Sequence, residues 1–265
     1  MSAQTAPRAT ARRAFLGLLQ RDAWNTLRHD LPGFLAQALL QPLAFLFVFG
    51  RVLPEIGAAG PDYGDQLLPG IIALTLVLTG LQNVALPLVI EFSFTKEIED
   101  RLLAPLPPWA VGLEKVVFAT GRAIVAAALI VPLGAVILPG GLDLSGASWP
   151  VFLLLLLVGG FAGGAIGLVL GTLVPPNQIN VVFAVALTPL IFTGATFYPW
   201  QSLDSLRWFQ AITLLNPLTY VSEGMRGALT SAPHLGAGWI VLGLAVSTAG
   251  FLVLGMRGFL RRAVD

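Results

Sequence analysis

The 265-residue sequence contains no cysteine and only two histidines, His29 and His234. The lack of cysteine excludes disulfide bonds, thiolate catalysis and cysteine-ligated zinc or iron–sulfur sites. Two histidines alone cannot build a metal-binding cluster. In the topology predicted below they lie on opposite sides of a membrane, which argues against an intramembrane Ser–His–Asp hydrolase. We therefore expect neither a metal site nor hydrolase chemistry in this chain.

Charge is also scarce. Only 11% of the residues are charged, whereas soluble domains are about a quarter charged. Hydrophobic residues make up 56%, and the net charge is +1 with the basic residues scattered. A nucleic-acid surface would need Lys and Arg gathered on one face, so none is expected. The composition indicates an integral membrane protein.

Six apolar runs are long enough to cross a bilayer, because about 20 helical residues span about 30 Å of hydrocarbon. They are residues 31–53, 67–90, 116–138, 150–174, 179–200 and 237–256. A spanning segment must satisfy its backbone polar groups internally, so each run is predicted to be a helix. We expect an all-α integral membrane fold with six transmembrane helices in one domain, residues 1–265.

The distribution of basic residues predicts the orientation. Eleven of the 15 Lys and Arg residues lie before the first run, between the second and third runs, or after the sixth. Because cytoplasmic loops carry the excess of positive charge, both termini are predicted to face the cytoplasm of a multi-pass plasma-membrane protein. Glu223, Arg207 and Arg226 then fall in short outer loops. The first 30 residues lack the apolar core of a cleaved signal peptide.

The segment from Phe15 to Leu31 is amphipathic. A helical wheel gathers apolar side chains on one half and polar ones on the other, with Leu18 as the exception. The two halves are Phe15, Leu16, Leu19, Ala23, Trp24 and Leu27, against Arg21, Asp22, Asn25 and Arg28. This pattern predicts an interface helix within residues 1–30 that lies in the inner headgroup plane with Trp24 as an anchor. A plain solvated leader is the alternative.

A second amphipathic helix is predicted between the second and third runs. Apolar residues Phe94, Ile98 and Leu102 repeat every four positions, and Pro105 stops the helix. Lys96 with Asp100, and Glu97 with Arg101, form opposite charges four residues apart, which favours ion pairs along the helix. Such a rigid charged helix suits force transmission to a soluble partner, although a solvated loop helix is the more common case.

Two further patterns concern packing and the outer face. In the fourth run, Gly159, Gly163, Gly167 and Gly171 recur every four residues, as in close helix packing within the chain or with a second copy. Residues 201–233 show two helical pieces broken at Asn216–Pro217. They predict either a re-entrant hairpin in the outer leaflet or an ordinary extracellular helical hairpin.

No motor is encoded in the sequence. The only lysines, Lys96 and Lys115, do not follow glycine, so there is no phosphate-binding P-loop and no ATP hydrolysis is expected. Ion channels and proton-coupled carriers usually place ionisable groups at mid-span, but here Arg122 sits near an inner helix end. The energy for any movement of this helix bundle is therefore expected to come from a separate cytoplasmic protein.

Two segments resemble the membrane permeases of ABC-2 type ATP-binding-cassette exporters. They are Lys96-Glu-Ile-Glu-Asp-Arg-Leu-Leu-Ala-Pro-Leu-Pro with Gly112-Leu-Glu-Lys115, and Leu215-Asn-Pro-Leu-Thr-Tyr-Val-Ser-Glu-Gly-Met-Arg226. The first looks like the family's Arg/Glu-rich segment ending in Leu-Leu-x-x-Pro, and the second like its Asn-Pro-x-x-Tyr segment. The family often has Gly-Thr where this chain has Ile98-Glu99-Asp100, so the charge of that contact differs.

The resemblance implies a non-catalytic permease subunit that pairs with a second permease, identical or paralogous, and with two ATPase subunits that bind ATP and Mg²⁺. It implies export of an amphipathic or hydrophobic substrate such as a lipid, glycolipid or drug from a bacterial inner membrane. A lipid-linked polysaccharide permease and a non-transport membrane scaffold or enzyme subunit are the alternatives. The resemblance also assigns three sets of residues. The connecting helix is assigned Phe15, Leu19, Arg21, Trp24 and Arg28; the ATPase-coupling segment Phe94, Lys96, Glu97, Ile98, Glu99, Asp100, Arg101, Leu102, Leu103 and Pro105; and the outer gate Asn216, Pro217, Tyr220, Glu223 and Arg226.

Overall fold

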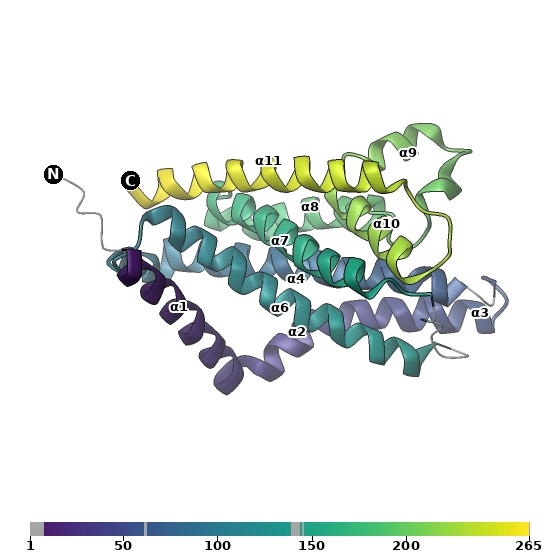
Figure 1. The fold of residues 1–265 in the computed structure, drawn as a ribbon, viewed down its shortest axis with the longest axis horizontal. Helices are drawn as coiled ribbons and strands as arrows, with labels where there is room; N and C mark the ends of the chain where they lie inside the picture. The colour runs from purple at the N-terminus through teal and green to yellow at the C-terminus, as the bar shows by residue number, and fades with distance from the viewer. Residues whose placement is uncertain (1–7, 61–62, 139–143, 145, 265) are drawn as a thin grey trace.

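The computed structural model describes residues 8–60, 63–138, 144 and 146–264, whose regular structure is entirely helical (Figure 1). The longer helices are α1 (Arg8–Asn25), α2 (Leu31–Phe47), α4 (Tyr63–Ile90), α6 (Pro108–Ile137), α7 (Trp149–Leu173), α8 (Ile179–Thr193), α10 (Pro217–Leu229) and α11 (Ala237–Val264). The short ones are α3 (Leu53–Glu55), α5 (Glu97–Leu102) and α9 (Arg207–Thr213). π-helical turns at Thr26–Asp30, Val48–Val52 and Glu91–Thr95 join α1 to α2, α2 to α3, and α4 to the α5 segment.

Five helical stretches in the described residues are long and apolar enough to cross a membrane. They are Ala11–Glu55, Gln66–Thr95, Pro108–Ile137, Trp149–Leu173 and Ala237–Ala263. The fifth predicted run, residues 179–200, is helical only as far as Thr193. At 15 residues α8 is about 22 Å long, short of a full hydrocarbon core. The chain turns after it because Gly194 leaves the helical conformation and Ala195 adopts a left-handed φ of 50°.

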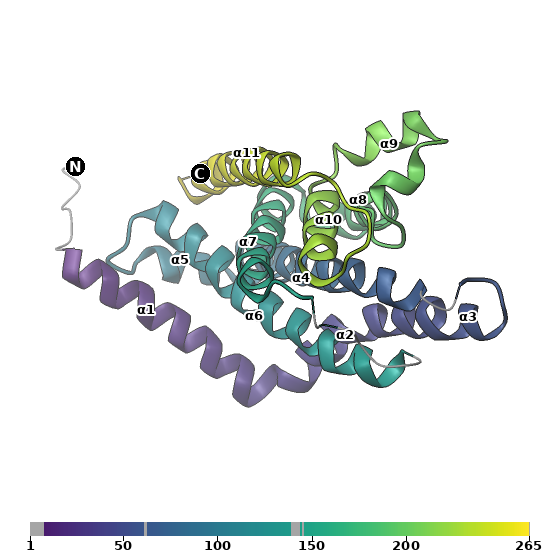
Figure 2. The same cartoon turned by 45° about the vertical axis from the view of Figure 1, so that its right-hand side comes forward.

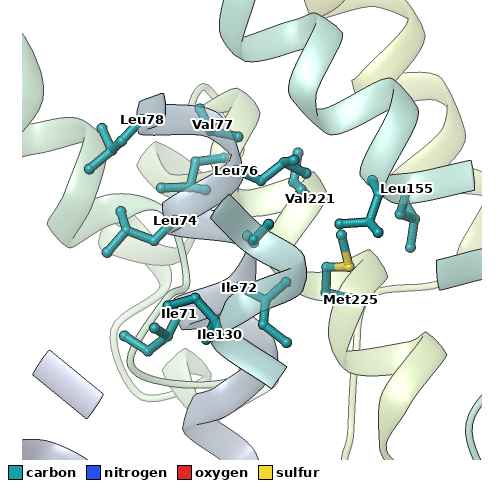
Figure 3. Packing of buried hydrophobic residues seen from close by; sticks show 14 of the residues in the cluster. Ile71, Ile72, Leu74, Leu76, Val77, Leu78, Ile130, Leu155, Val221 and Met225 are labelled. Carbon is teal, nitrogen blue, oxygen red and sulfur yellow. The ribbon is translucent and has the colours of Figure 1, made fainter. Parts of the chain in front are cut away.

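Helix α4 forms the centre of the bundle. Of its most apolar stretch, 78% is buried, whereas the corresponding share in the peripheral α11 is 17%. Helices α2, α6, α7 and α10 pack around α4 (Figures 1 and 2). Figure 3 shows the packing of Ile71, Ile72, Leu76 and Val77 of α4 with neighbouring apolar side chains that include Ile130 and Val221. The polar group of the buried Thr75 is satisfied locally, because its hydroxyl donates to the Ile71 carbonyl at 2.7 Å.

The glycine stripe of α7 lies against α4 of the same chain. A Cβ added to Gly163 would lie 2.5 Å from the Val77 carbonyl oxygen, and one added to Gly167 would lie 2.4 Å from that of Leu81. Gly171 meets Leu88 and Ala85 in the same way, while Gly159 faces Leu76 and Val221. Since lipid tails are as apolar as the side chains, close backbone approach of this kind is a main source of helix association in membranes.

The elements of interest gather at the two ends of the bundle. The start of α1, the whole of α5 and the end of α11 lie at one end, which we call the α5 end (Figures 1 and 2). Helices α3 and α9 lie at the opposite end, which we call the α3 end. Helix α1 runs obliquely from the α5 end along α6 and meets α2 at the bend formed by Thr26–Asp30.

Candidate functional site

Helix α5 is set off from the end of α4 by a backbone break at Lys96. This residue has a left-handed φ of 56°, which separates the π-helical turn Glu91–Thr95 from α5. A non-glycine residue in this conformation costs about 1–3 kcal/mol and persists only where the surrounding contacts hold it. The sequence predicted one continuous helix that carries Phe94, Ile98 and Leu102 on one stripe. That prediction is wrong for Phe94, which lies before the break and is 72% exposed.

The two faces of α5 have different surroundings. Ile98 is buried and Leu102 half-buried in an apolar cluster that includes Val111 and Phe259. The other side chains of the predicted coupling segment are exposed, namely Phe94, Lys96, Glu97, Glu99, Asp100, Leu103 and Pro105. Of these, Glu97 and Asp100 also border the cavity described below. The helix ends at Leu102, before Pro105, and Pro108 begins α6. An anchored inner face and an acidic, partly apolar outer face are thus combined in one short helix.

A buried cluster of charges fixes α5 to its neighbours. The Nη2 atom of Arg101 donates to both carboxylate oxygens of Asp22 on α1, at 2.9 Å each. Its Nη1 lies 3.5 Å from Oε2 of Glu114 on α6, and its Nε lies 3.8 Å from Oε2 of Glu91. The ammonium of Lys115 pairs with the other oxygen of Glu91. Four segments therefore meet at the guanidinium of Arg101.

Electrostatics favours the charged state of this arginine despite its burial. The Arg101 side chain is only 5% exposed. Burial disfavours the guanidinium charge, but the three surrounding carboxylates favour it, so the pKa of Arg101 lies above its ordinary value. Removing one partner of such a buried pair costs about 3–5 kcal/mol, because an uncompensated charge remains. The cluster therefore holds α1, α5 and α6 as one mechanical unit.

Two sequence-based expectations about these charges are corrected by the structure. Arg101 does not pair with Glu97 along the helix surface but turns inward to Asp22, Glu91 and Glu114. The Nζ atom of Lys96 lies 3.8 Å from Oε1 of Glu99, and this pair replaces the predicted one with Asp100. The buried carboxylates attract the guanidinium more strongly than one exposed carboxylate in water, where a surface pair contributes only about 0–1 kcal/mol.

Helix α1 turns one residue of its predicted polar half toward the bundle. Asp22, placed by the wheel on the solvated half, points to the bundle and is 12% exposed at its side chain. Leu18, the exception in the wheel, is half-buried together with Phe15 and Leu19. Leu16, Arg21, Trp24, Leu27 and Arg28 are exposed, and the Arg28 guanidinium stacks 4.0 Å from the centre of the Trp24 ring. The need to neutralise Arg101 explains why a polar residue occupies the inner face.

A polar cavity of about 590 Å³ opens beside the charge cluster. Residues of α1, α4, α5 and α6 line it, among them Asp22, Asn83, Asp100, Arg101 and Lys115. Its wall is shared by the predicted interface helix and the predicted coupling segment. The structure thus brings these two sets of residues together, a contact that the sequence alone did not indicate.

Helix α10 carries a second buried ion pair. The side chains of Glu223 and Arg226 are fully buried and form a salt bridge three residues apart. Glu223 also accepts from the backbone N–H of Trp200 at 3.0 Å and of Leu235 at 2.7 Å. Arg226 donates to the carbonyl of Ala195 at 3.2 Å. The pair therefore joins α10 to the irregular segments on either side of it.

The predicted gate residues lie on α10 or at its start, and hydrogen bonds join them to the neighbouring segments. Asn216 caps the helix, since its Oδ1 accepts from the N–H of Leu218 at 2.9 Å while its Nδ2 donates to the Leu190 carbonyl at 2.8 Å. Pro217 is buried at the first turn, and the Tyr220 hydroxyl donates to the Leu214 carbonyl at 2.7 Å. The sequence placed Glu223 and Arg226 between the spans on the outer side, and the structure shows them fully buried on α10. They are buried because each neutralises the other.

The sequence analysis assigned no role in a charge cluster to three residues of the cluster around Arg101, namely Glu91, Glu114 and Lys115. The signal that could have found them is their position at the ends of apolar runs. Glu91 directly follows the second run and Lys115 directly precedes the third, so the two are expected at the same side of a membrane. Charges that flank consecutive spans on one side are natural partners for each other.

Comparison with known proteins agrees with this architecture. The family model described as ABC-2 type transporter matches residues 13–230, from within α1 to the end of α10. The chain belongs to the ABC-2 type transporter family. It is 29% identical over 207 residues to the protein named "Putative transport permease ycf38" of Cyanophora paradoxa, covering 74% of this chain and 67% of that one. The protein of the same name from Porphyra purpurea is 28% identical over 205 residues, with the same coverage. This ABC-2 chain is accordingly a multi-pass membrane transport permease.

Proposed function

We propose that this ABC-2 permease is the non-catalytic membrane subunit of an ATP-binding-cassette exporter, driven by separate ATPase subunits that bind ATP and Mg²⁺. The observation that carries the proposal is the construction of α5. Its inner face is anchored by Ile98 and Arg101, while Glu97, Glu99 and Asp100 remain exposed beside the apolar Leu103. Such a face fits a partner groove with basic and apolar walls.

The buried charges supply a route for force. Because Arg101 ties α5 to α1 and α6, a displacement of α5 by closing ATPase subunits moves these helices together instead of bending a loop. Two permeases, identical or paralogous, would then open a cavity between them toward the outer side. The central α4 packs against α6 and would follow the same movement.

The proposed placement sets the α5 end in the cytoplasm, with both termini on that side. The Lys and Arg residues near that end follow the positive-inside pattern. Helix α8 then serves as a sixth, short span, continued by the α9–α10 segment as a re-entrant outer hairpin. Support for this hairpin comes from α9 and its flanks, where Leu206, Trp208, Ile212 and Leu215 are exposed apolar residues suited to the outer leaflet.

The cargo is proposed to be amphipathic or hydrophobic, such as a lipid, a glycolipid or a drug. Many exposed residues of the long helices are large and apolar, which favours an apolar or amphipathic cargo over a hydrophilic solute. Lipid-linked polysaccharide is the alternative cargo that a transport experiment distinguishes.

The test is reconstitution of the permease into proteoliposomes with an ATPase encoded beside it. ATP is expected to drive export of a fluorescent phospholipid or a lipophilic dye, and an ATPase unable to hydrolyse ATP serves as the control. Movement of lipid-linked glycan alone would replace the proposed cargo class. If the ATPase neither binds the permease nor changes its turnover in its presence, the scaffold alternative takes the place of the transporter.

A further inference from the structure

Two cavities of opposite character meet at the bend between α1 and α2. The polar cavity of about 590 Å³ beside the charge cluster is lined partly by Thr26, Phe118 and Arg122. An apolar groove of about 470 Å³ between α1, α2 and α6 is lined by the same three residues. The remaining wall of the groove is apolar and includes Leu27 and Phe34. Together they form one amphipathic space, polar toward the α5 end and apolar along α6.

Arg122 stands at the junction of these two spaces with unused hydrogen-bonding capacity. Its guanidinium lies 4.2 Å from the centre of the Phe34 ring, and its Nη2 lies 3.4 Å from a carboxylate oxygen of Asp30. Its Nε is buried and has no hydrogen-bond partner among the described residues. A planar guanidinium that remains 15% exposed next to an apolar groove is suited to hold a phosphate beside its contact with Asp30.

The polar cavity also offers acceptors for a cation. Within the described part of the chain, no salt bridge joins Glu97 or Asp100 to a Lys or Arg, although both line the cavity. The other cations of the cavity wall also pair with carboxylates, Arg21 and Arg101 with Asp22 and Lys115 with Glu91. A ligand that carries both a phosphate and an ammonium group matches this arrangement, whereas a purely anionic headgroup would meet two uncompensated carboxylates.

We propose that this space binds one resident membrane phospholipid of the phosphatidylethanolamine type. Its phosphate is held by Arg122, its primary ammonium donates to Glu97 and Asp100, and an acyl chain lies in the groove along Leu27 and Phe34. Both cavities fall in the range of about 300–1,000 Å³ in which proteins enclose small ligands. The lipid would join α1, α5 and α6 through its headgroup, beside the Arg101 cluster. This inference rests on the proposed membrane placement and goes beyond the transport function.

The test uses the full chain, delipidated in detergent and examined by native mass spectrometry. Dioleoyl-phosphatidylethanolamine, -phosphatidylcholine and -phosphatidylglycerol are added one at a time over a concentration series. We expect one saturable site with phosphatidylethanolamine strongest, because a quaternary ammonium cannot donate hydrogen bonds to the carboxylates. Absence of a saturable site, or tightest binding of phosphatidylglycerol, would overturn the proposal.

Substitutions in the polar cavity test the headgroup contacts independently of the acyl chain of the lipid. Arg122→Gln should weaken phosphatidylethanolamine at least about tenfold, as expected for loss of a charged hydrogen bond. Arg51→Gln is the matched control, because Arg51 pairs with Glu55 outside both cavities and should bind lipid as the wild type does. The double change Glu97→Gln with Asp100→Asn should abolish the preference for phosphatidylethanolamine over phosphatidylglycerol. Equal affinity in wild type and Arg122→Gln contradicts the phosphate assignment.

A second test does not depend on a charged residue. Gly121 lines the apolar groove, and a Cβ added there meets no atom within 4 Å. Gly121→Leu should therefore fold normally yet fill the groove and reduce lipid retention, while Gly250→Leu, at an equally open site on α11, should retain it. Lipid retention unchanged by Gly121→Leu contradicts the acyl-chain assignment. Both experiments use the permease alone. A negative result would therefore count against the lipid site and not against the proposed ATPase partner, which is tested separately by reconstitution.

Discussion

Arg101 of α5 and Asp22 of α1 are joined by two hydrogen bonds of 2.9 Å, although they lie 79 residues apart in the sequence. The contact makes a single unit of the helix that is proposed to receive force and the helix that precedes the first span. The Nη2 atom makes both bonds, while Nη1 and Nε of the same guanidinium lie near Glu114 and Glu91. Contacts from three nitrogens fix the orientation of the group as well as its distance. The geometry of this pair explains how a short helix of six residues can be held rigidly.

Loss of this pair is expected to destabilise the protein. Arg101→Ala leaves Glu91, Glu114 and Asp22 without their shared cation, so we expect a loss of about 3–5 kcal/mol. Arg101→Lys should recover only part of it, because a single ammonium cannot reach Asp22, Glu91 and Glu114 at once, as the three guanidinium nitrogens do. The readout is the apparent melting temperature in one detergent. Arg21→Ala, with a side chain 57% exposed, is the control and should shift stability by less than about 1 kcal/mol.

The two faces of α5 should respond differently to the same substitution. Leu103→Asp alters a side chain that is 84% exposed, so the permease should accumulate normally in the membrane but lose ATPase binding. Ile98→Asp places a charge in the buried cluster around Phe259 and should lower the yield itself. Membrane yield and co-purification of the ATPase are measured side by side. Equal yields for both variants would show that Ile98 is not an anchor.

The close approach of α7 to α4 predicts intolerance to one added methyl group. Gly163→Ala would place a Cβ 2.5 Å from the Val77 carbonyl oxygen and should cost about 1–3 kcal/mol, as overpacking does. Gly250→Ala is the matched control, because open space surrounds that site in α11 and alanine favours a helix. If both variants melt alike, the α4–α7 contact is looser than the structure has it.

The buried pair on α10 should show strong coupling between its members. Glu223→Leu strands the charge of Arg226 and frees the Trp200 and Leu235 amides, so a loss of about 3–5 kcal/mol is expected. The double variant with Arg226→Met should lose less than the two single losses added together, since no charge is left unpaired. Thermal melts of all four proteins close the cycle. Strict additivity would mean that the two groups act independently.

Much of the helical architecture was predictable from the apolar runs. Their length and lack of charge are what a membrane span requires, and five of them correspond to helices long enough to cross. The helix predicted over residues 179–200 is longer than the observed α8, because the apolar character of the sequence continues past the helix end at Thr193. The backbone turn at Ala195, with its positive φ, is fixed by contacts such as the Arg226 hydrogen bond, which hydropathy does not record.

The candidate site was less accessible to sequence reasoning because its partners are distant in the chain. Spacing rules along one helix favoured Glu97 as the partner of Arg101, whereas burial selected Asp22, Glu91 and Glu114. The same limitation applies to Glu223 and Arg226, which were assigned to an outer segment between apolar runs without any sign that they pair. Only the packing of α10 into the bundle reveals that the two charges satisfy each other.

The most direct test of the permease assignment is a cysteine crosslink, which the cysteine-free chain allows without background. Asp100→Cys on the exposed face of α5 is paired with single-cysteine forms of the neighbouring ATPase, with and without ATP, and Asp204→Cys at the α3 end is the control. A nucleotide-sensitive crosslink is expected from residue 100 and none from residue 204. No crosslink from any exposed position of α5, or equal crosslinking from both ends, would contradict the permease assignment.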